Sequence, residues 1–289
     1  MQLATLKDGG LAVIRQGKAF GLDDCIGSGA SMIDLITLYE AKKNSIEAHV
    51  SGQPGVDLLE DSLAAPVLKP SKIWGAAGNY QRGSKNLDNT GGRGEAKTAT
   101  PEELLETIFL KPPSAVIGPG DNIVIPRNAQ TVFPELELCV VIGKECRGVS
   151  VSDAMAVVFG YSVVLDVTAR GYGSGKNLVG TRNVRKGFDT FAPVGPWIVT
   201  RDEIPDPQDL TMKLWVNDEL RQAASTQGMI NGVAQLVSYL SEVGTLFPGD
   251  LIASGNPDAP DFQQQLAAGD TLTAEIEGVG RMKIGVERE

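Results

Sequence analysis

Two glutamates, separated by one residue at the start of an apolar run, are the feature of this sequence best suited to chemistry. Glu135 and Glu137 stand in the segment 134–143, which reads PELELCVVIG. Side chains alternate between the two faces of a β-strand, so both carboxylates point to one face while Leu136 and Leu138 point to the other. Two anions entering a buried sheet repel each other unless a cation or a proton compensates them. A hard divalent cation, which prefers oxygen ligands, is such a partner.

The same pattern has a plainer interpretation, because a solvated strand end also carries two exposed glutamates. Two further segments help to decide between a metal site and a solvated strand end. An apolar run at 161–165 ends in Asp166, with Arg170 four residues later. Lys186 lies in the segment 185–197, which mixes a basic pair with glycines and aromatic residues. Taken alone, the first is an Asp–Arg pair that caps a strand, and the second is a loop that leads into a strand.

Taken together and in order, these segments resemble the fumarylacetoacetate hydrolase family. The resemblance runs from residue 109 to residue 255 and rests on five motifs, which are FLKPPS at 109–114, PELEL at 134–138, DVTAR at 166–170, KGFDTF at 186–191 and PGDLIASG at 248–255. It implies a mixed α+β, β-rich fold, in which a mixed β-sandwich roll forms the catalytic domain after a small N-terminal α/β domain. It also implies a homodimer or a higher homo-oligomer.

The resemblance also assigns the metal site. Glu135, Glu137 and Asp166 are implied as ligands of Mg²⁺ or Mn²⁺, with Ca²⁺ as a further candidate, and three carboxylates leave the remaining positions for waters and a chelating substrate. A 2-oxo acid offers its carboxylate and its keto oxygen as that chelate. The metal then acts as a Lewis acid while a neighbouring carbon–carbon bond breaks.

Other positions acquire roles through the resemblance alone. Lys186 corresponds to the active-site lysine of the family, and Arg170 falls where the family places an arginine, so both are expected to be catalytic. The expected substrate-binding residues are Tyr80, Lys111 and Asn256.

Two departures from the family pattern affect the reaction. Hydrolytic members carry N-Y-x-x-H-x-x-E, but the stretch 79–86 reads NYQRGSKN, which places Gly83 and Asn86 at the positions of the His–Glu dyad. His49, the single histidine of the chain, lies far away in the N-terminal region and is expected to be a surface residue. A general base must reach its proton directly or through one water. The acidic candidates near the motif are Glu95, Glu102, Glu103 and Glu106. In the second departure, Asn256 stands where the family often has threonine.

The resulting first hypothesis is a metal-dependent hydrolase that cleaves a carbon–carbon bond in a 2,4-dioxo acid. Its products are a 2-oxo acid and a carboxylic acid. A second hypothesis keeps the fold and the metal but replaces hydrolysis by isomerisation, hydration or decarboxylation, and the missing dyad favours it. A third is a non-catalytic binder of small molecules, against which the clustered carboxylates and Lys186 weigh.

The elements that must position these residues follow from periodicity. Residues 1–68 read as a small N-terminal unit with a strand near 10–14 and a helix over 31–43, and residues 69–289 form the catalytic domain. Strands are expected at 123–125, 138–142, 157–165, 214–216 and 251–253. Helices are expected at 152–158 and at 232–243, the latter with Asn231 as its N-cap. The polar segment 83–100 reads as a long loop.

Composition limits the classes of partner. The chain has 289 residues and a net charge of −10, so its field repels phosphate backbones, and nucleic acid is an unexpected partner. No apolar run approaches the roughly 20 residues of a membrane span. Three cysteines without a CxxC pair argue against a disulfide framework. Residues 1–10 lack the pattern of a secretory signal, so a cytoplasmic location is expected.

Overall fold

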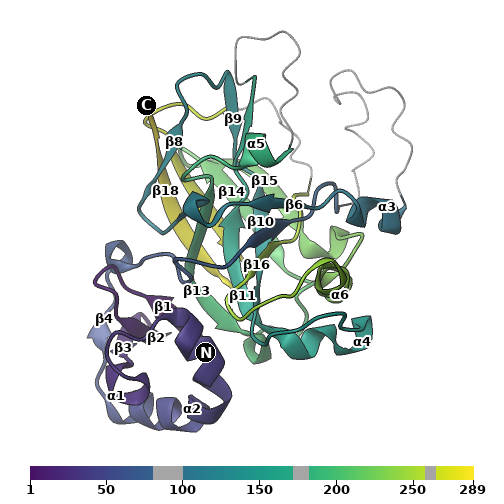
Figure 1. The fold of residues 1–289 in the computed structure, drawn as a ribbon. Helices are drawn as coiled ribbons and strands as arrows, with labels where there is room; N and C mark the ends of the chain where they lie inside the picture. Colours follow the sequence, from purple (N-terminus) through teal and green to yellow (C-terminus); the bar gives the residue numbers. More distant parts are fainter. Residues whose placement is uncertain (81–99, 172–181, 258–264) are drawn as a thin grey trace.

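A computed structural model describes residues 1–80, 100–171, 182–257 and 265–289 (Figure 1). Within these ranges, no helix combines the length and the apolar character needed to cross a membrane.

The largest sheet has eleven strands and runs through the whole molecule. Its central strands are long and buried, as the apolar runs of the sequence require. The order along the sheet is β4 (Val56–Asp57), β3 (Lys18–Gly21), β2 (Leu11–Arg15), β1 (Gln2–Thr5), β13 (Ala192–Thr200), β11 (Val158–Leu165), β10 (Leu136–Ile142), β16 (Leu251–Ala253), β5 (Ile73–Gly75) and β6 (Phe109–Lys111), while β7 (Val116–Ile117) pairs with β13.

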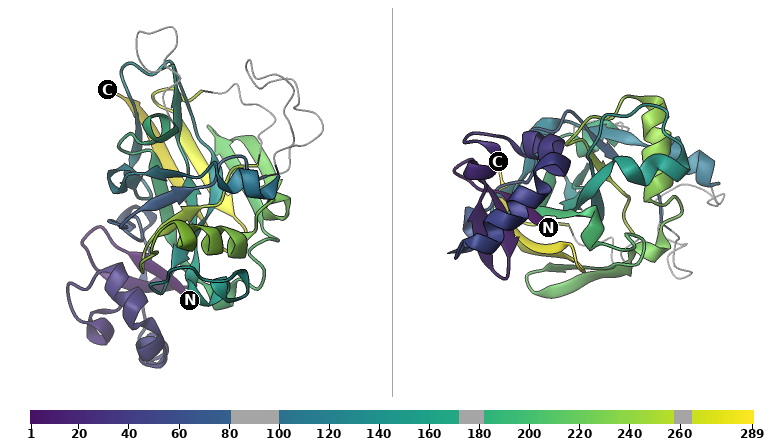
Figure 2. Two further views of the ribbon diagram at one scale, coloured as in Figure 1. Left: turned by 45° about the vertical axis from the view of Figure 1, so that its right-hand side comes forward. Right: turned by 90° about the horizontal axis from the view of Figure 1, so that it is seen from below.

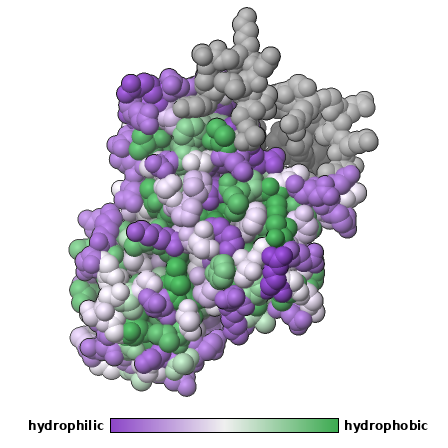
Figure 3. Space-filling view, in the orientation of Figure 1, coloured by the Kyte–Doolittle hydropathy of each residue, from purple (hydrophilic) through white to green (hydrophobic). Residues whose placement is uncertain are grey.

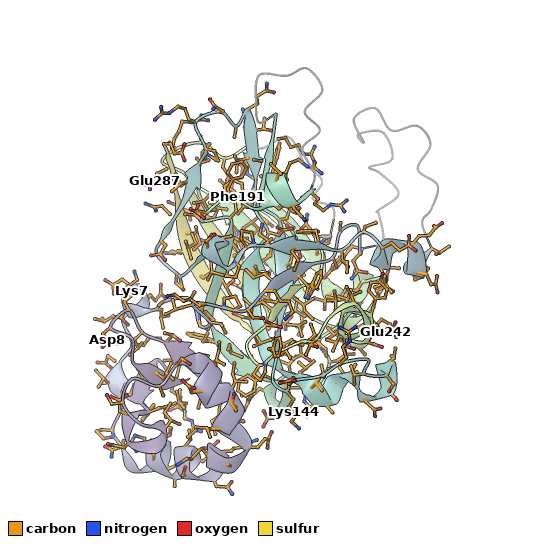
Figure 4. The ribbon with its side chains drawn as sticks, in the orientation of Figure 1. Lys7, Asp8, Lys144, Phe191, Glu242 and Glu287 are labelled. Carbon is orange, nitrogen blue, oxygen red and sulfur yellow. The ribbon has the colours of Figure 1, made fainter. Side chains whose placement is uncertain are left out.

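A second sheet of five strands packs against the first. Its order is β15 (Glu219–Ser225), β14 (Thr211–Val216), β17 (Thr271–Ile276), β18 (Gly280–Arg288) and β8 (Asn122–Ile125), and a separate pair joins β9 (Thr131–Phe133) to β12 (Thr168–Arg170). The main core lies between the sheets and includes Leu138, Tyr161 and Phe191 from one side and Met212 and Leu272 from the other. Figure 4 labels Phe191 within this core. The predicted β-rich α+β class is confirmed.

Helices pack around this framework (Figure 1). The α-helices are α1 (Asp23–Ile26), α2 (Met32–Gly52), α3 (Pro101–Leu105), α4 (Val151–Ala154), α5 (Arg182–Lys186) and α6 (Val233–Val243), and the 3₁₀ turns are η1 (Glu60–Ser62), η2 (Pro113–Ala115), η3 (Met155–Val157), η4 (Arg201–Glu203) and η5 (Thr226–Gly228). Ser31 begins α2 with a capping box, in which its hydroxyl accepts from the Asp34 amide while Asp34 accepts from the Ser31 amide.

The N-terminal unit is joined to the rest of the molecule by backbone pairing. Strand β1 lies antiparallel to β13, with Leu3 opposite Ile198. A second core joins Leu35 and Ile46 of α2 to Val141 of β10 and Val164 of β11. Figure 2 shows the purple N-terminal unit packed directly against one end of the sheet. The expected division at 68/69 therefore separates two segments that share one sheet and one core.

Most expected elements are present, with shifted ends. The helix predicted over 31–43 continues to Gly52, and the segment 152–158 splits into α4 and η3 before β11 begins. The prediction of Asn231 as N-cap is wrong by one residue, since Gly232 is the N-cap of α6. Asn231 has other partners, because its side chain donates to Pro101 O and its amide donates to Asn79 Oδ1. The predicted loop lies outside the described residues except for Thr100.

Figure 3 shows apolar patches interrupted by polar side chains on one face of the molecule. The exposed large hydrophobic residues come from separate elements, including Val56 and Leu59 of the N-terminal unit, Leu220 of β15 and Val243 of α6.

Candidate metal centre

The register of two central strands brings the carboxylates together. Strands β10 and β11 are antiparallel, and Leu136 lies opposite Leu165. The residue before β10, Glu135, therefore meets the residue after β11, Asp166, and the Asp166 amide donates to Glu135 O at 2.8 Å. Glu137, one residue into β10, presents its carboxylate to the same place. The apolar runs buried on both faces thus explain why residues thirty positions apart in sequence meet.

Glu135, Glu137 and Asp166 form a compact acidic cluster. One carboxylate oxygen from each lies within 4.8 Å of the others. Asp166 is fully buried, Glu137 is 2% exposed, and Glu135 lies at the open side with its side chain 15% exposed. Three buried or half-buried anions in such proximity are costly unless positive charge compensates them.

Two lysines supply positive charge at this cluster. Lys111 Nζ lies 2.7 Å from Asp166 Oδ1 and also donates to Val167 O and Lys186 O. Lys186 Nζ lies 2.5 Å from Glu135 Oε2 and contacts Asp166 Oδ2 as well. Each oxygen of Asp166 therefore has its own ammonium group.

The pKa values follow from this arrangement. Burial, reinforced by Asp166, raises the pKa of Glu137 well above its usual range. Burial alone would raise the pKa of Asp166 too, but Lys111 and Lys186 outweigh it and lower that pKa. The pKa of Lys186 is raised because Asp166 and Glu135 outweigh burial, whereas burial lowers the pKa of Lys111. Glu137 is thus the carboxylate that most lacks a cation.

The orientation of Glu137 is fixed by a backbone amide. The Gly255 N–H, two residues after β16, donates to Glu137 Oε2 at 2.7 Å. Gly255 has φ of +101°, and a Cβ there would lie 2.8 Å from Asn79 Cβ, so this position requires glycine. Asn79 holds the same turn, because its amide donates to Ser254 O and to Asn231 O.

The donor set fits a hard divalent cation. All three groups are carboxylates, and the pKa of Glu137 is raised by burial among like charges, which a divalent ion would reverse. Thr168 Oγ1 lies 3.4 Å from Glu135 Oε2 and helps to orient that carboxylate. Among the described residues, this is the group of acidic, histidine and cysteine side chains with metal-binding geometry.

The structure brings some of the other predicted site residues to this cluster and leaves others away from it. Lys111 is fully buried and pairs with Asp166 at 2.7 Å. Tyr80 is buried in the main core with its hydroxyl 3.8 Å from Met212 Sδ. Asn256, with its amide oriented to satisfy its neighbours, donates to Leu136 O and Gln222 Oε1 at 3.2 Å, beside the start of β10.

Arg170 is exposed at the end of β12, and its guanidinium lies over the Phe133 ring at 5.4 Å from the centroid. His49 is on α2, where its Nε2 lies 2.9 Å from Gly21 O. It belongs to the N-terminal unit, where it is half-buried.

Only some of the candidates for a general base lie within the described residues. Glu95 and the dyad positions Gly83 and Asn86 lie outside the described residues. Glu102, Glu103 and Glu106 are exposed on or next to α3, and Glu103 accepts from the Thr100 amide in a helix cap.

Sequence reasoning missed the groups that hold the cluster in place. The amide of Gly255 and the hydroxyl of Thr168 act on Glu137 and Glu135, and Phe109 lies under Lys186 Nζ at 4.9 Å from the ring centroid. Gly255 and Thr168 stand inside the motifs PGDLIASG and DVTAR, so those motifs were the available signal. Backbone donors carry no side-chain signature, which is why the contact itself was not predicted.

Comparisons with known proteins find related sequences and structures. Residues 72–287 match the family described as fumarylacetoacetate (FAA) hydrolase C-terminal. Maleylpyruvate hydrolase of Aquipseudomonas alcaligenes is 36% identical over 254 residues, which cover 87% of this chain and 85% of that protein.

Solved structures cover the whole chain. The maleylpyruvate hydrolase of Sphingobium sp. SYK-6, in complex with manganese(II) ion and pyruvate, has a TM-score of 0.82 and 36% identity, covering 100% of this chain and 99% of that one. The 2-hydroxyhepta-2,4-diene-1,7-dioate isomerase of Mycobacterium marinum has a TM-score of 0.72 and 31% identity, covering 100% and 99%.

Proposed function

The chain belongs to the fumarylacetoacetate hydrolase family, and from that premise we propose that it is a divalent-metal-dependent hydrolase of 2,4-dioxo acids. It cleaves a carbon–carbon bond in an acylpyruvate-like substrate and releases a 2-oxo acid and a carboxylic acid. The observation that carries the proposal is the cluster of Glu135, Glu137 and Asp166 with Lys186 against two of its carboxylates. The manganese and pyruvate in the similar Sphingobium structure support the choice of cofactor and product.

The proposed cofactor is Mg²⁺ or Mn²⁺, held by Glu135, Glu137 and Asp166. A divalent cation bound there supplies Lewis-acid polarisation of substrate oxygens. Glu137 must give up its proton to serve as a ligand, and the Gly255 amide holds its oxygen in place while it does so. Lys111 keeps Asp166 ionised and oriented, because it pairs with the oxygen that Lys186 does not contact.

Lys186 has the catalytic role in this proposal. Its ammonium lies at the open side of the cluster, next to Glu135, where the keto oxygen of a chelated 2-oxo acid would be placed. The Nζ group donates a hydrogen bond to this oxygen and stabilises the negative charge that develops on it. Arg170, exposed on β12, takes the distal group of the substrate, and Asn256, beside the start of β10, lies on the substrate side.

A second candidate keeps the fold and the cation but ends in isomerisation, hydration or decarboxylation. The residues at the dyad positions, Gly83 and Asn86, favour it, since neither can act as a general base. The similarity to the isomerase of Mycobacterium marinum supports the same alternative. The two candidates predict different products from the same substrates.

Product analysis by NMR separates them. Acetylpyruvate, oxaloacetate and a 2-hydroxy-dienoate are each incubated with the protein, once with Mg²⁺ and once with EDTA. Acetate and pyruvate that form only with metal establish the hydrolase. Isomerised, hydrated or decarboxylated products identify the second candidate, and metal binding without turnover of any substrate indicates a binding protein.

A further inference from the structure

A pocket of about 140 Å³ lies between the N-terminal unit and the catalytic sheet, away from the acidic cluster. Helix α2 contributes Tyr39 and Lys43, and the end of η3 and the start of β11 contribute Val157 to Phe159. The end of β13 and the start of η4 contribute Thr200 to Asp202. Lys144, which follows β10, also lines it, and Figure 4 labels Lys144 at the end of the catalytic part next to the N-terminal unit. We refer to this space as the interface pocket.

The interface pocket contains a hydroxyl that lacks a partner. Tyr39 is 4% exposed, and its hydroxyl, although near Thr200, makes no hydrogen bond of normal geometry to any described residue. The Tyr39 ring is held in place by an edge-to-face contact with Phe159, with the ring centroids 5.2 Å apart. Since a buried hydroxyl without a partner costs free energy, an acceptor in the pocket would stabilise the structure.

The charged residues around the pocket leave an excess of positive charge. Lys43 pairs with Asp202 at 2.6 Å. Arg201 donates to the neutral Met155 O, and Lys144 forms no ion pair with any residue that the structure describes. Glu40 is the remaining anion of the lining. Two cations therefore face one uncompensated carboxylate, so the lining favours an anionic ligand.

The size and the apolar part of the pocket limit that ligand. Cavities of about 150 Å³ hold a molecule as large as benzene, which has six heavy atoms. Ile36, Val157 and Val158 supply apolar lining beside the aromatic pair. We propose that the interface pocket binds a small carboxylate with a short apolar tail, whose oxygens accept from Tyr39 and pair with Lys144 and Arg201. Bound there, the ligand bridges the two parts of the chain and stabilises the whole molecule.

Sodium propionate tests the proposal, because it has the right size and lacks the keto oxygen of a 2-oxo acid. Binding to the full chain is measured by saturation-transfer NMR, and thermal unfolding is followed in the same titration. We expect millimolar binding and a rise of Tm with propionate. Tyr39→Phe and Lys144→Gln should each weaken propionate binding at least about fivefold, while both variants keep the fold, since one keeps its ring and the other alters an exposed side chain.

Two controls separate this site from the acidic cluster. Glu137→Gln alters the acidic cluster and should leave propionate binding unchanged. Lys283→Gln removes an exposed charge on β18 and should also leave propionate binding unchanged. If the wild-type chain shows no propionate signal, the pocket holds only water and the proposal fails. It fails equally if Tyr39→Phe and Lys144→Gln bind propionate as the wild type does, or if Glu137→Gln alone abolishes binding.

Discussion

At the scale of residues, the acidic cluster depends on two lysines that have different tasks. Lys111 is tied to Asp166 and to two backbone carbonyls, so its position is fixed by three acceptors. Lys186 contacts two carboxylates and one aromatic ring and lies at the more open side. A cation that enters the cluster therefore displaces Lys186 more easily than Lys111.

Glu137→Gln is predicted to remove divalent-metal binding and metal-dependent turnover. Glutamine keeps the shape and can still accept from the Gly255 amide, but it supplies no anionic ligand. We expect Mn²⁺ affinity to fall about 100-fold or more, with folding intact, because a buried anion with a raised pKa is removed. Calorimetric titration with Mn²⁺ checks this, with exposed Glu145→Gln as the matched control. Turnover like that of the wild type would show that Glu137 is not a ligand.

Lys186→Met is predicted to lower kcat about 100- to 1,000-fold, as expected when a donor to a developing oxyanion is lost. Metal affinity should be retained or improved, because the ammonium that competes for Glu135 and Asp166 is gone. Steady-state kinetics and Mn²⁺ titration measure the two effects separately, and Lys283→Met serves as the exposed control. A large loss of metal affinity with little change of kcat would contradict the catalytic role.

Lys111→Met is predicted to destabilise the fold by about 3–5 kcal/mol, because it leaves Asp166 buried with only one ammonium partner. Urea unfolding at neutral pH measures the loss. The double variant Lys111→Met with Asp166→Asn should recover part of it, since the unpaired charge is then removed. Equal stability of the single variant and the wild type would mean that the buried pair is not needed.

Much of this cluster could be predicted from the residues themselves. Alternation in PELEL placed Glu135 and Glu137 on one face, and the apolar run before Asp166 placed a third carboxylate at a strand end. The role of Lys111 could not be predicted, because whether a lysine faces substrate or supports an aspartate depends on burial that local sequence does not encode. The hydrogen bond from the Gly255 amide to Glu137 could not be predicted either, because the two residues meet only when distant strands pair.

At the scale of elements, α2 is the helix that fixes the N-terminal unit. It begins at a capping box and places Leu35, Tyr39 and Ile46 against the sheet. The same helix forms one wall of the interface pocket.

Ser31→Ala is predicted to destabilise the molecule by about 1 kcal/mol, because it removes the side-chain acceptor that caps α2. Thermal unfolding should show a lower Tm, and amide exchange should rise first in the opening turn of α2. Ser45→Ala is the control on the same helix, where the hydroxyl donates only to Lys42 O. A Tm unchanged by Ser31→Ala but lowered by Ser45→Ala would refute the role of the cap.

The strands of the catalytic part were the elements most readily predicted, because β10, β11 and β16 are largely apolar. Their last residues were predicted correctly, and β16 kept its predicted bounds. Only the starts of β10 and β11 shifted, to Leu136 and Val158. The start of α6 shifted because Asn231, a favoured N-cap residue, bonds instead to Pro101 and Asn79. Local preference was overridden there by contacts from distant parts of the chain.

At the scale of the whole molecule, the ion pair between Lys43 of α2 and Asp202 of η4 crosses from the N-terminal unit to the catalytic part. Partial burial opposes ionisation of Asp202, but the hydrogen bond and the positive charge of Lys43 lower its pKa to about 2. The folded pKa lies below the ordinary 3.8, so the stabilisation is complete above 3.8 and is lost as the pH falls towards 2.

The predicted consequence is that wild type and Asp202→Asn differ most in stability at neutral pH and converge at low pH. The gap should close as the pH falls from about 4 towards 2, and it should shrink with added salt, because half of this carboxylate is exposed. Urea unfolding of both proteins at a series of pH values measures the difference in stability. Asp57→Asn, which removes an ion pair inside the N-terminal unit, serves for comparison. A gap that widens as the pH falls would contradict the sign of the shift.

The assembly of the chain also belongs to this scale, and the resemblance leads us to propose a homodimer or a higher homo-oligomer. Light scattering on the purified chain measures this. The sequence suggested a separate N-terminal unit because lysine and proline interrupt the chain at residues 69–72. The sheet that joins the two parts was not predictable, since β1 gives no local sign of its distant partner β13.

This pairing sets the order in which the protein can form during synthesis. Gln2 lies opposite Val199, almost two hundred residues later, so β1 leaves the ribosome long before its partner strand exists. Until then the first hairpin presents an open edge on which another nascent chain could pair. Closure of so long a loop slows folding, and the earliest residues of the chain are among the last to find their final place.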